Sequence, residues 1–171
     1  MTRPAIRRIR ADEAPSLRAL RLRALGEAPM AFGSTLAREA AFTDDVWRER
    51  AQRGASGSDT ITVVAERSGQ WLGIATGLAR APDNPADPRP ELVAMFVAPE
   101  ARRCGLGIAL VEAVAGWARE RKAPGLTLWV TAANEAAVAL YTRCGFRRTG
   151  ESKPLDHAPG VASIRMVRDL L

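Results

Sequence analysis

The sequence predicts a single α/β domain whose sheet is mixed rather than purely parallel. Strand-like and helix-like segments alternate along the chain, and two early strands, 60–67 and 71–80, are separated only by a short turn. A hairpin pairs its strands antiparallel, whereas a strand–helix–strand unit pairs them parallel, so the presence of both patterns favours a mixed sheet. The length of 171 residues fits one domain with one apolar core.

The first third of the chain is predicted to hold one strand and two helices. Residues 4–10 form the strand, and residues 12–25 form a helix because leucines recur there near helical spacing. The segment GEAPMAFGST then interrupts the helical pattern with glycine and proline. The second helix is expected to run from Thr43, an N-cap candidate followed by two aspartates, to about Arg53.

The middle of the chain carries the hairpin, a proline-rich loop and a third strand. The hairpin is predicted to turn at Ser68-Gly69. The ten residues 81–90 include four prolines, which excludes regular structure there. The apolar segment ELVAMFV, residues 91–97, is the third strand.

Helices and strands alternate in the last part of the chain. Residues 110–118 place apolar side chains on one face of a helix. The apolar segment GLTLWV, residues 125–130, follows that helix and is therefore the predicted crossover partner of 91–97. A further helix runs from near Asn134 to Gly145, its C-terminal glycine. Two more strands close the sheet, at 146–151 and 161–170.

Composition indicates a globular protein and limits its partners. Hydrophobic residues make up 47% of the chain and charged residues 26%, both ordinary values for globular domains. No apolar run approaches the length of a membrane helix, and the N-terminus lacks the apolar centre of a secretory signal, so no membrane association and a cytoplasmic location are expected. Cys104, Cys144 and the single histidine His157 cannot complete a four-ligand zinc site, so no metal is expected.

The net charge of +6 raises the alternative of a nucleic-acid-associated module. The basic residues are almost all arginines, and they are scattered, with neither a basic block nor interleaved aromatic residues. We therefore expect no nucleic-acid partner. The same positive field suits a small polyanionic ligand equally well.

The stretch ARRCGLGIAL, residues 101–110, places glycines where the long helix begins. A helix N-terminus presents unsatisfied N–H groups and partial positive charge, so it can bind phosphate. We expect Gly105 and Gly107 to keep side chains away from a pyrophosphate, and Arg102 and Arg103 to add donors to its oxygens. The structural alternative is a glycine-punctuated surface turn.

Two familiar phosphate loops do not fit this stretch. A Walker loop needs a Gly-Lys-Ser/Thr sequence, and no lysine is present here. The dinucleotide fingerprint G-x-G-x-x-G would need a glycine where Leu110 stands.

Two motifs resemble those of the GNAT N-acetyltransferase superfamily. Arg102-x-x-Gly105-x-Gly107 is similar to its R/Q-x-x-G-x-G/A signature, which holds the pyrophosphate of acetyl-CoA. NEAAVALYTRCGF, from Asn134 to Phe146, resembles its N-x-x-A-x-x-x-Y-x-x-x-G-F segment at every fixed position.

The resemblance implies a bacterial GNAT domain over residues 1–171, with a mostly antiparallel twisted sheet flanked by helices. The match is firm over about 91–150, the implied acetyl-CoA core, and looser over the implied acceptor side, mainly 12–58. One departure is Arg103, where many relatives carry glycine. The cofactor-binding residues that the resemblance implies are Phe96, Val97, Arg102, Arg103, Cys104, Gly105, Leu106, Gly107, Ile108, Asn134 and Tyr141.

Tyr141 is the candidate proton donor to the CoA thiolate. It follows Asn134 by seven residues, nearly two helical turns, so both side chains are expected on one helix face. A phenol with a pKa near 10 is protonated at neutral pH and can donate. The alternative is a half-buried core tyrosine. The resemblance also implies backbone N–H groups near Phe96 and Val97 as donors to the pantetheine and to the oxyanion of the tetrahedral intermediate.

Glu91 is the candidate general base, because an alkylammonium with a pKa of about 10.4 must lose a proton before it attacks. It opens the strand that leads into the glycine loop, where some family members carry a catalytic glutamate, and it can act directly or through water. The alternative is an ordinary solvated carboxylate. Four further acidic residues in the acceptor segment are candidates for attracting a cationic amine: Glu39, Asp44, Asp45 and Glu49.

The sequence thus predicts transfer of an acetyl group from acetyl-CoA to a primary amine, by direct attack in a ternary complex. A small-molecule amine is preferred over a protein N-terminus or lysine, because no peptide-binding feature is recognisable. The alternatives are a protein or peptide acetyltransferase and a non-catalytic CoA-binding sensor. A homodimer is compatible with the resemblance.

Overall fold

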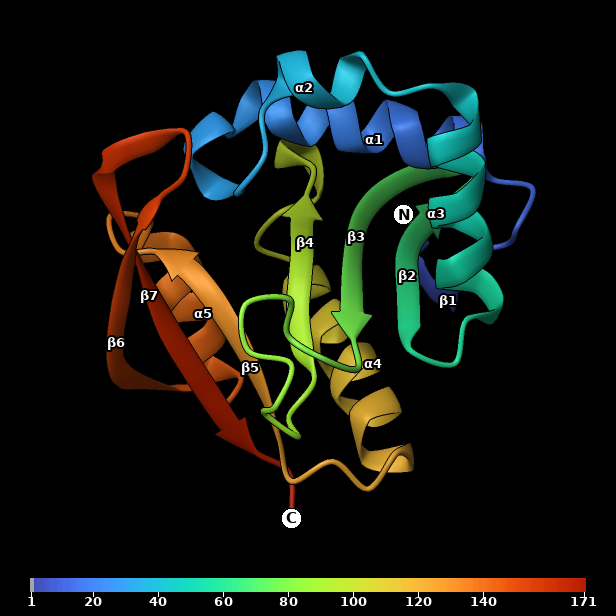
Figure 1. Cartoon of the computed structure of the whole chain (residues 1–171). Helices are drawn as coiled ribbons and strands as arrows, with labels where there is room; N and C mark the ends of the chain where they lie inside the picture. Colours follow the sequence, from blue (N-terminus) through green and yellow to red (C-terminus); the bar gives the residue numbers. More distant parts are fainter. Residues whose placement is uncertain (1) are drawn as a thin grey trace.

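The computed structural model describes residues 2–171 and is built on a seven-stranded sheet of order β1-β2-β3-β4-β5-β7-β6 (Figure 1). Only β4 and β5 pair parallel, and every other neighbouring pair is antiparallel. The mixed, mostly antiparallel sheet is therefore confirmed. The strands are β1 (Ala5–Arg8), β2 (Thr60–Arg67), β3 (Gln70–Leu78), β4 (Glu91–Val97), β5 (Gly125–Thr131), β6 (Arg147–Leu155) and β7 (Ala158–Asp169).

Helices cover both faces of the sheet (Figure 1). The helices are α1 (Ala14–Glu27), α2 (Leu36–Ala40), α3 (Asp44–Ser56), α4 (Leu106–Glu120) and α5 (Glu135–Arg143), with short 3-10 turns η1 (Pro29–Ala31) and η2 (Pro99–Ala101). The first three helices lie over one face, and α4 and α5 lie over the other. Within residues 2–171, no helix has the length and apolar character needed to cross a membrane.

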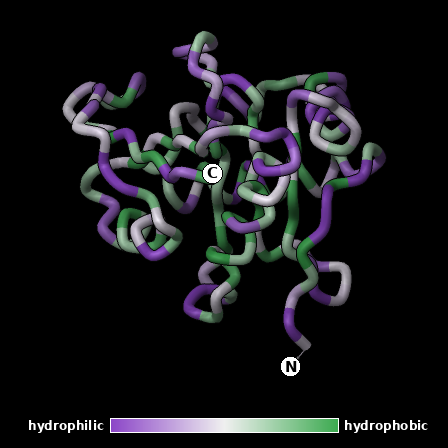
Figure 2. Tube along the Cα trace, turned by 90° about the horizontal axis from the view of Figure 1, so that it is seen from below, coloured by the Kyte–Doolittle hydropathy of each residue, from purple (hydrophilic) through white to green (hydrophobic). Residues whose placement is uncertain are grey.

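Each face of the sheet carries its own apolar core. On the α4 side, Leu110, Val111 and Val114 are fully buried against strand residues, as the predicted apolar helix face requires. On the α1 side, Leu25 and Trp47 occupy the centre of a second cluster. Figure 2 shows the hydrophobic stretches of the trace running through the middle of the molecule, with hydrophilic stretches mainly in its outer loops.

Most element boundaries lie within three residues of prediction, and the main differences are the following. The first strand is shorter than 4–10, because only residues 5–8 pair with β2. The short helix α2 was not predicted; it begins after Thr35, whose hydroxyl accepts a hydrogen bond from the Arg38 N–H at 3.2 Å. The closing strands are longer than predicted, because β6 is an exposed edge strand with irregular register and no apolar alternation to mark its length. Residues 81–90 contain no strand or helix, as their prolines predicted.

The sheet opens in its middle, between β4 and β5. The two strands pair with each other only at Glu91↔Thr127 and Leu92↔Leu128. Beyond Leu92 and Leu128, β4 and β5 no longer pair with each other. On its other side, β4 carries a bulge, where Ala94 adopts a φ of +53° and the register with β3 shifts. The second half of β4 therefore has one edge without a strand neighbour.

Candidate active site

The start of α4 presents backbone N–H groups without intrahelical partners. Gly105 precedes the helix with a φ of +79°, in the left-handed region that favours glycine, and it supplies no side chain to cap the helix. The first amide to bond back is that of Ala109, which donates to the Gly105 carbonyl at 3.1 Å. The amides of residues 106–108 are consequently available to an anion. A Cβ added at Gly105 would meet no atom within 4 Å, so the space beside it is open.

Gly107 has a packing role that the sequence did not reveal. A Cβ added there would lie 3.0 Å from Leu140 Cδ2 on α5 and 3.6 Å from Met95 Cε on β4. Its missing side chain therefore lets α4 approach Leu140 and Met95 closely. Spacing along a helix does not reveal which neighbour faces each position, so this packing reason was not predicted, and the phosphate role of Gly107 stays a prediction.

The two arginines of the loop take different positions. Arg102 donates from Nε to the Val97 carbonyl at 2.9 Å, and its guanidinium carbon lies 5.9 Å from the centre of the Phe96 ring. Arg103 is exposed and has a φ of +61°, in the left-handed region. Glycine adopts that conformation without strain. This backbone conformation is a physical reason for the glycine that the family resemblance implies at this position.

The remaining loop residues divide between surface and core. Cys104 is exposed, and its thiol donates to the Ala101 carbonyl at 2.9 Å. Leu106 is buried in the α4-side core, so only its backbone faces the loop. Ile108 is an exposed large hydrophobic residue on the first turn of α4.

The hydrogen bonds between β3 and β4 show in which direction the amides of Phe96 and Val97, the two candidate backbone donors, point. The Ala98 amide donates to the Leu72 carbonyl of β3 at 2.9 Å. Since alternate residues of a strand face the same neighbour, Phe96 also directs its amide toward β3, and Val97 directs its amide toward the open edge. Only the Val97 amide lies on the side where β4 and β5 separate.

Asn134 and Tyr141 lie at opposite ends of α5. Asn134 caps the helix, because its Oδ1 accepts a hydrogen bond from the Ala137 N–H at 3.1 Å. Tyr141 is 7% exposed and packs edge-on against Phe146, with ring centres 5.9 Å apart. Burial raises the pKa of the Tyr141 phenol, so this group stays protonated at neutral pH.

Glu91 lies at a cavity of about 480 Å³ on the α1 side of the sheet. The carboxylate is 5% exposed, and within residues 2–171 its Oε1 has no hydrogen-bond partner. Burial, followed by the negative charge of Asp83, raises the pKa of Glu91 to about 7. A carboxyl group with this pKa can accept or release a proton near neutral pH.

Glu91 and Tyr141 lie on opposite sides of the sheet. Glu91 lines the cavity beneath α1 and α3, whereas Tyr141 belongs to the core that α4 shares. The separation of β4 and β5 after Leu92 and Leu128 opens the sheet between them. The fold thus places a buried carboxyl group with a raised pKa on one side of the sheet and a protonated phenol on the other.

The four acidic residues that were predicted to attract a cationic amine do not line this cavity. Glu39 is 1% exposed and is held by Arg21 at 2.9 Å and Arg50 at 3.0 Å. Burial would raise the pKa of Glu39, but the hydrogen bond and charges of the two arginines outweigh burial and lower it. Neither Glu39 nor the exposed acidic residues at 44, 45 and 49 line the cavity.

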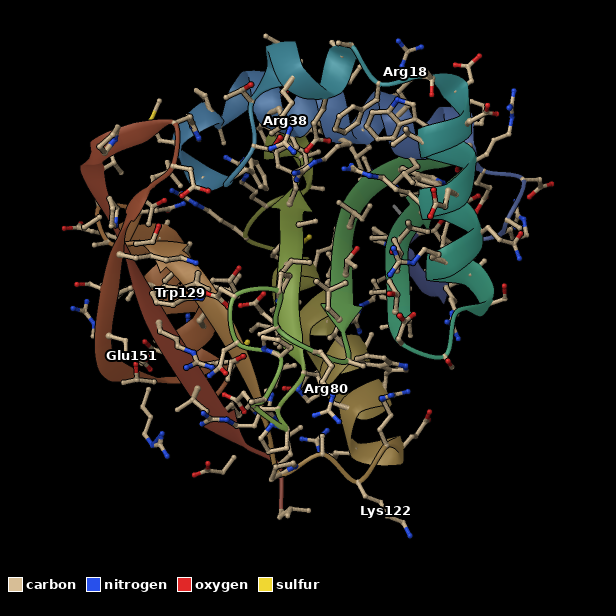
Figure 3. All side chains as sticks on the ribbon, in the orientation of Figure 1. Arg18, Arg38, Arg80, Lys122, Trp129 and Glu151 are labelled. Atoms are coloured by element: carbon tan, nitrogen blue, oxygen red, sulfur yellow. The ribbon has the colours of Figure 1, made fainter. Side chains whose placement is uncertain are left out.

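Arginines and aromatic rings line the cavity instead, and sequence reasoning did not identify them. Arg21 comes from α1, and Arg50 and Arg53 come from α3. Trp129 comes from β5 and is labelled in Figure 3. Their positions are far apart in the chain and match no local motif, so only the packing of the helices on the sheet reveals them as one group.

Comparison with known proteins agrees with this architecture. Residues 23–146 match the model of the acetyltransferase (GNAT) family. The peptidyl-lysine N-acetyltransferase YjaB of Escherichia coli strain K12 is 42% identical over 60 residues, which cover 35% of this chain and 37% of that protein. The match therefore spans little more than a third of that relative's length.

Solved structures share the whole fold. A GNAT-family acetyltransferase from Streptococcus pneumoniae superposes with a TM-score of 0.79 at 22% identity, covering 98% of this chain and 99% of that one. The structure of yncA from Salmonella typhimurium with its cofactor acetyl-CoA gives a TM-score of 0.77 at 19% identity, covering 99% and 95%. Because the family model spans well over half of the chain, this protein belongs to the acetyltransferase (GNAT) family and is an acetyltransferase enzyme.

Proposed function

We propose that this enzyme transfers the acetyl group of acetyl-CoA to the primary amine of a small molecule, by direct attack in a ternary complex. The single observation that carries the proposal is Glu91, a buried residue whose Oε1 has no hydrogen-bond partner among residues 2–171, at a cavity of about 480 Å³. A cavity of this size is typical of small-molecule sites. In this proposal residues 12–58 form the acceptor side and residues 91–150 the acetyl-CoA core.

The chain offers a fitting place for the pyrophosphate of acetyl-CoA. The amides of residues 106–108 have no intrahelical partners, and the space beside Gly105 is open. A helix N-terminus adds partial positive charge. Arg103 is exposed beside these amides and supplies a guanidinium for the phosphate oxygens.

Glu91 acts as the general base in this proposal. The acceptor ammonium, with a pKa of about 10.4, must lose its proton before its nitrogen can attack a thioester. With a pKa of about 7, Glu91 is partly ionised at neutral pH and takes up that proton, directly or through one water. The carboxylate needs no rearrangement to do so, because no protein group occupies its Oε1.

The other two roles fall to Val97 and Tyr141. The Val97 amide faces the open edge of β4, where it can stabilise negative charge that develops on the carbonyl oxygen. Tyr141 keeps its phenolic proton because burial raises its pKa, and it donates that proton to the leaving thiolate. Asn134 contributes by capping the helix that carries Tyr141.

A lysine side chain of a peptide is the second candidate acceptor. The name of the partly matching Escherichia coli relative, a peptidyl-lysine N-acetyltransferase, favours it. A lysine chain is also a primary amine that a cavity of about 480 Å³ can admit.

The test is a free-thiol release assay with acetyl-CoA against small amines and lysine-containing peptides, paired with calorimetric binding of acetyl-CoA. We expect thiol release with small amines and a large loss of release in Glu91→Gln with acetyl-CoA affinity retained. Tight acetyl-CoA binding without thiol release for any amine contradicts the proposal and favours a CoA-binding sensor. Efficient release with peptides alone favours the lysine acceptor.

A further inference from the structure

The acceptor cavity contains more positive charge than its partners neutralise. Arg21 and Arg50 both line it, and both bond the single buried carboxylate of Glu39. Two guanidinium groups share one carboxylate, so this trio carries a net charge of +1, and Glu91, with a pKa of about 7, offsets only part of that charge at neutral pH. The third cavity arginine, Arg53, lies 3.5 Å from exposed Asp59 and is approximately neutralised.

Arg21 also has unused hydrogen-bonding capacity. Its Nε and Nη2 donate to Glu39 at 3.1 and 2.9 Å, and its guanidinium carbon lies 4.8 Å from the centre of the Phe32 ring, which fixes its orientation. Its Nη1 is buried and, within residues 2–171, has no hydrogen-bond partner. An unsatisfied buried donor on a charged group is unfavourable, so an acceptor from a ligand is favoured there.

Within residues 2–171, four further buried polar atoms without hydrogen-bond partners belong to residues that line the same cavity. Glu91 Oε1 is a hydrogen-bond acceptor, the indole Nε1 atoms of Trp47 and Trp129 are donors, and the Ser34 hydroxyl can do either. The remaining wall includes apolar side chains, among them Phe32 and Ile74. The cavity thus combines a cationic group, a carboxylate that accepts a proton and an apolar surface.

We propose that the acceptor is a small primary amine that also carries an anionic group, a carboxylate or a phosphonate, and an apolar body. The anion is held by Arg21, with the charge of Arg50 supporting it, while the amine lies at Glu91. This inference rests on the proposed function and adds the substrate class. It also disfavours polycationic acceptors, because they would bring further positive charge to Arg21 and Arg50.

The experiment uses three pairs of amines that differ only in the anion: L-phenylalanine with L-phenylalaninamide, L-leucine with L-leucinamide, and 6-aminohexanoate with 6-aminohexanamide. Binding of each compound to the CoA-loaded protein is measured by calorimetry, and kcat/KM is measured by thiol release. We expect the carboxylate member of at least one pair to be favoured by about tenfold or more in both measurements, as for a lost charge-assisted hydrogen bond of about 1.5–3 kcal/mol. For the α-amino acids this preference runs against amine reactivity, because the amide lowers the pKa of the neighbouring ammonium.

Variants of the cavity arginines then test which residues cause the preference for the carboxylate. Arg21→Gln is expected to reduce it to less than about threefold, with KM for acetyl-CoA changed by no more than about twofold. Because Arg21→Gln also removes a partner of buried Glu39, Arg50→Gln provides a second variant in which the Arg21–Glu39 pair survives. Arg18→Gln is the matched control, since Arg18 is exposed on the outer side of α1 and does not line this cavity (Figure 3).

The results separate this inference from the proposed function. Equal binding of both members of all three pairs, absence of binding by all six compounds, or preference for the amides overturns the inference. An equal loss of preference in Arg18→Gln overturns the assignment to the cavity arginines. Carboxylate-selective binding without thiol release would support the substrate class while contradicting the acetyl-transfer proposal.

Discussion

At the scale of single residues, Glu91 shows how environment converts an ordinary carboxyl group into a candidate base. Burial is the largest cause of its raised pKa, and the negative charge of Asp83 is the next. Lys153 and Arg165 act in the opposite direction without cancelling burial. The sequence identified this glutamate by its position at the start of the strand that leads into the glycine loop, but the shift that gives it a pKa of about 7 depends on the cavity around it.

Replacement of Glu91 by glutamine should separate catalysis from stability. We expect kcat to fall by about 10²–10³-fold and the rise of activity with pH through about 7 to disappear, because no proton acceptor remains. The folded pKa exceeds the unfolded value of 4.5, so ionisation of buried Glu91 lowers stability as pH rises from about 4.5 to about 7. Glu91→Gln should therefore be more stable than the wild type above pH 7, by about 1–3 kcal/mol in urea unfolding, and similar near pH 4.5. Unchanged kcat would exclude Glu91 as the base.

Replacement of Asp83 by asparagine should lower the pKa of Glu91 while leaving Glu91 itself unchanged. Asp83 is an exposed partner of Lys153 at 2.9 Å, and its charge disfavours ionisation of Glu91. Removing that charge should move the acid limb of the pH–kcat/KM profile to lower pH, by a few tenths of a unit because solvent screens exposed charges. Asp169→Asn, which removes an exposed carboxylate paired with Arg147, is the control and should leave the limb unchanged.

Tyr141→Phe tests the role of the phenol. We expect kcat to fall by about 10–100-fold, because the leaving thiolate loses its proton donor, with acetyl-CoA affinity within a few fold of the wild type. The ring remains packed on Phe146, so the midpoint of thermal unfolding should change little. Wild-type turnover at all pH values would assign Tyr141 to the core alone.

At the scale of elements, the loop before α4 contains two glycines with distinct physical reasons. Gly105 supplies the left-handed turn and the open space at the helix start. Gly107 allows α4 to approach Leu140 of α5 and Met95 of β4. The motif spacing predicted both glycines as one phosphate cradle, because a sequence signature records which residues recur and not what each one contacts.

Gly107→Val should consequently act on packing. A side chain at this position would collide with Leu140, so we expect a loss of about 1–3 kcal/mol in the free energy of unfolding. Leu140→Ala in the same chain should recover part of that loss by making room. Thermal and urea unfolding of the wild type, the single variant and the double variant checks this. If Gly107→Val instead leaves stability unchanged and abolishes acetyl-CoA binding, the phosphate interpretation is correct after all.

At the scale of the whole molecule, the proline-rich segment beside Glu91 is fixed by a charge network that spans the chain. Asp87 accepts hydrogen bonds from Arg89 at 2.8 Å and from Arg165 of β7 at 2.6 Å. The Arg89 hydrogen bond is the largest cause that holds the pKa of Asp87 well below its usual range. This network fastens residues 81–90 to the far half of the sheet.

Asp87→Asn should destabilise the protein by about 1.5–3 kcal/mol, because buried Arg165 would lose a charge-assisted hydrogen bond and keep only exposed Glu151 as a charged partner. The folded pKa of Asp87 lies below the unfolded value, so its stabilisation is present above about pH 4 and is lost as pH falls toward the folded pKa. Urea unfolding at pH 7 and pH 3 should show a larger difference between wild type and variant at pH 7. Asp169→Asn should cost no more than about 1 kcal/mol, since its ion pair is exposed.

The sequence by itself determined the α/β class, the early hairpin, the parallel crossover from β4 to β5 and the two family motifs. These features depend on local backbone preference and on the period of apolar residues, which are written in neighbouring positions. Tertiary structure alone decided that Arg21, Arg50, Trp129 and Glu91 share one cavity, and that Gly107 faces Leu140. Helices packing across a sheet bring together positions that have no fixed separation along the chain, so no local pattern could have specified these contacts.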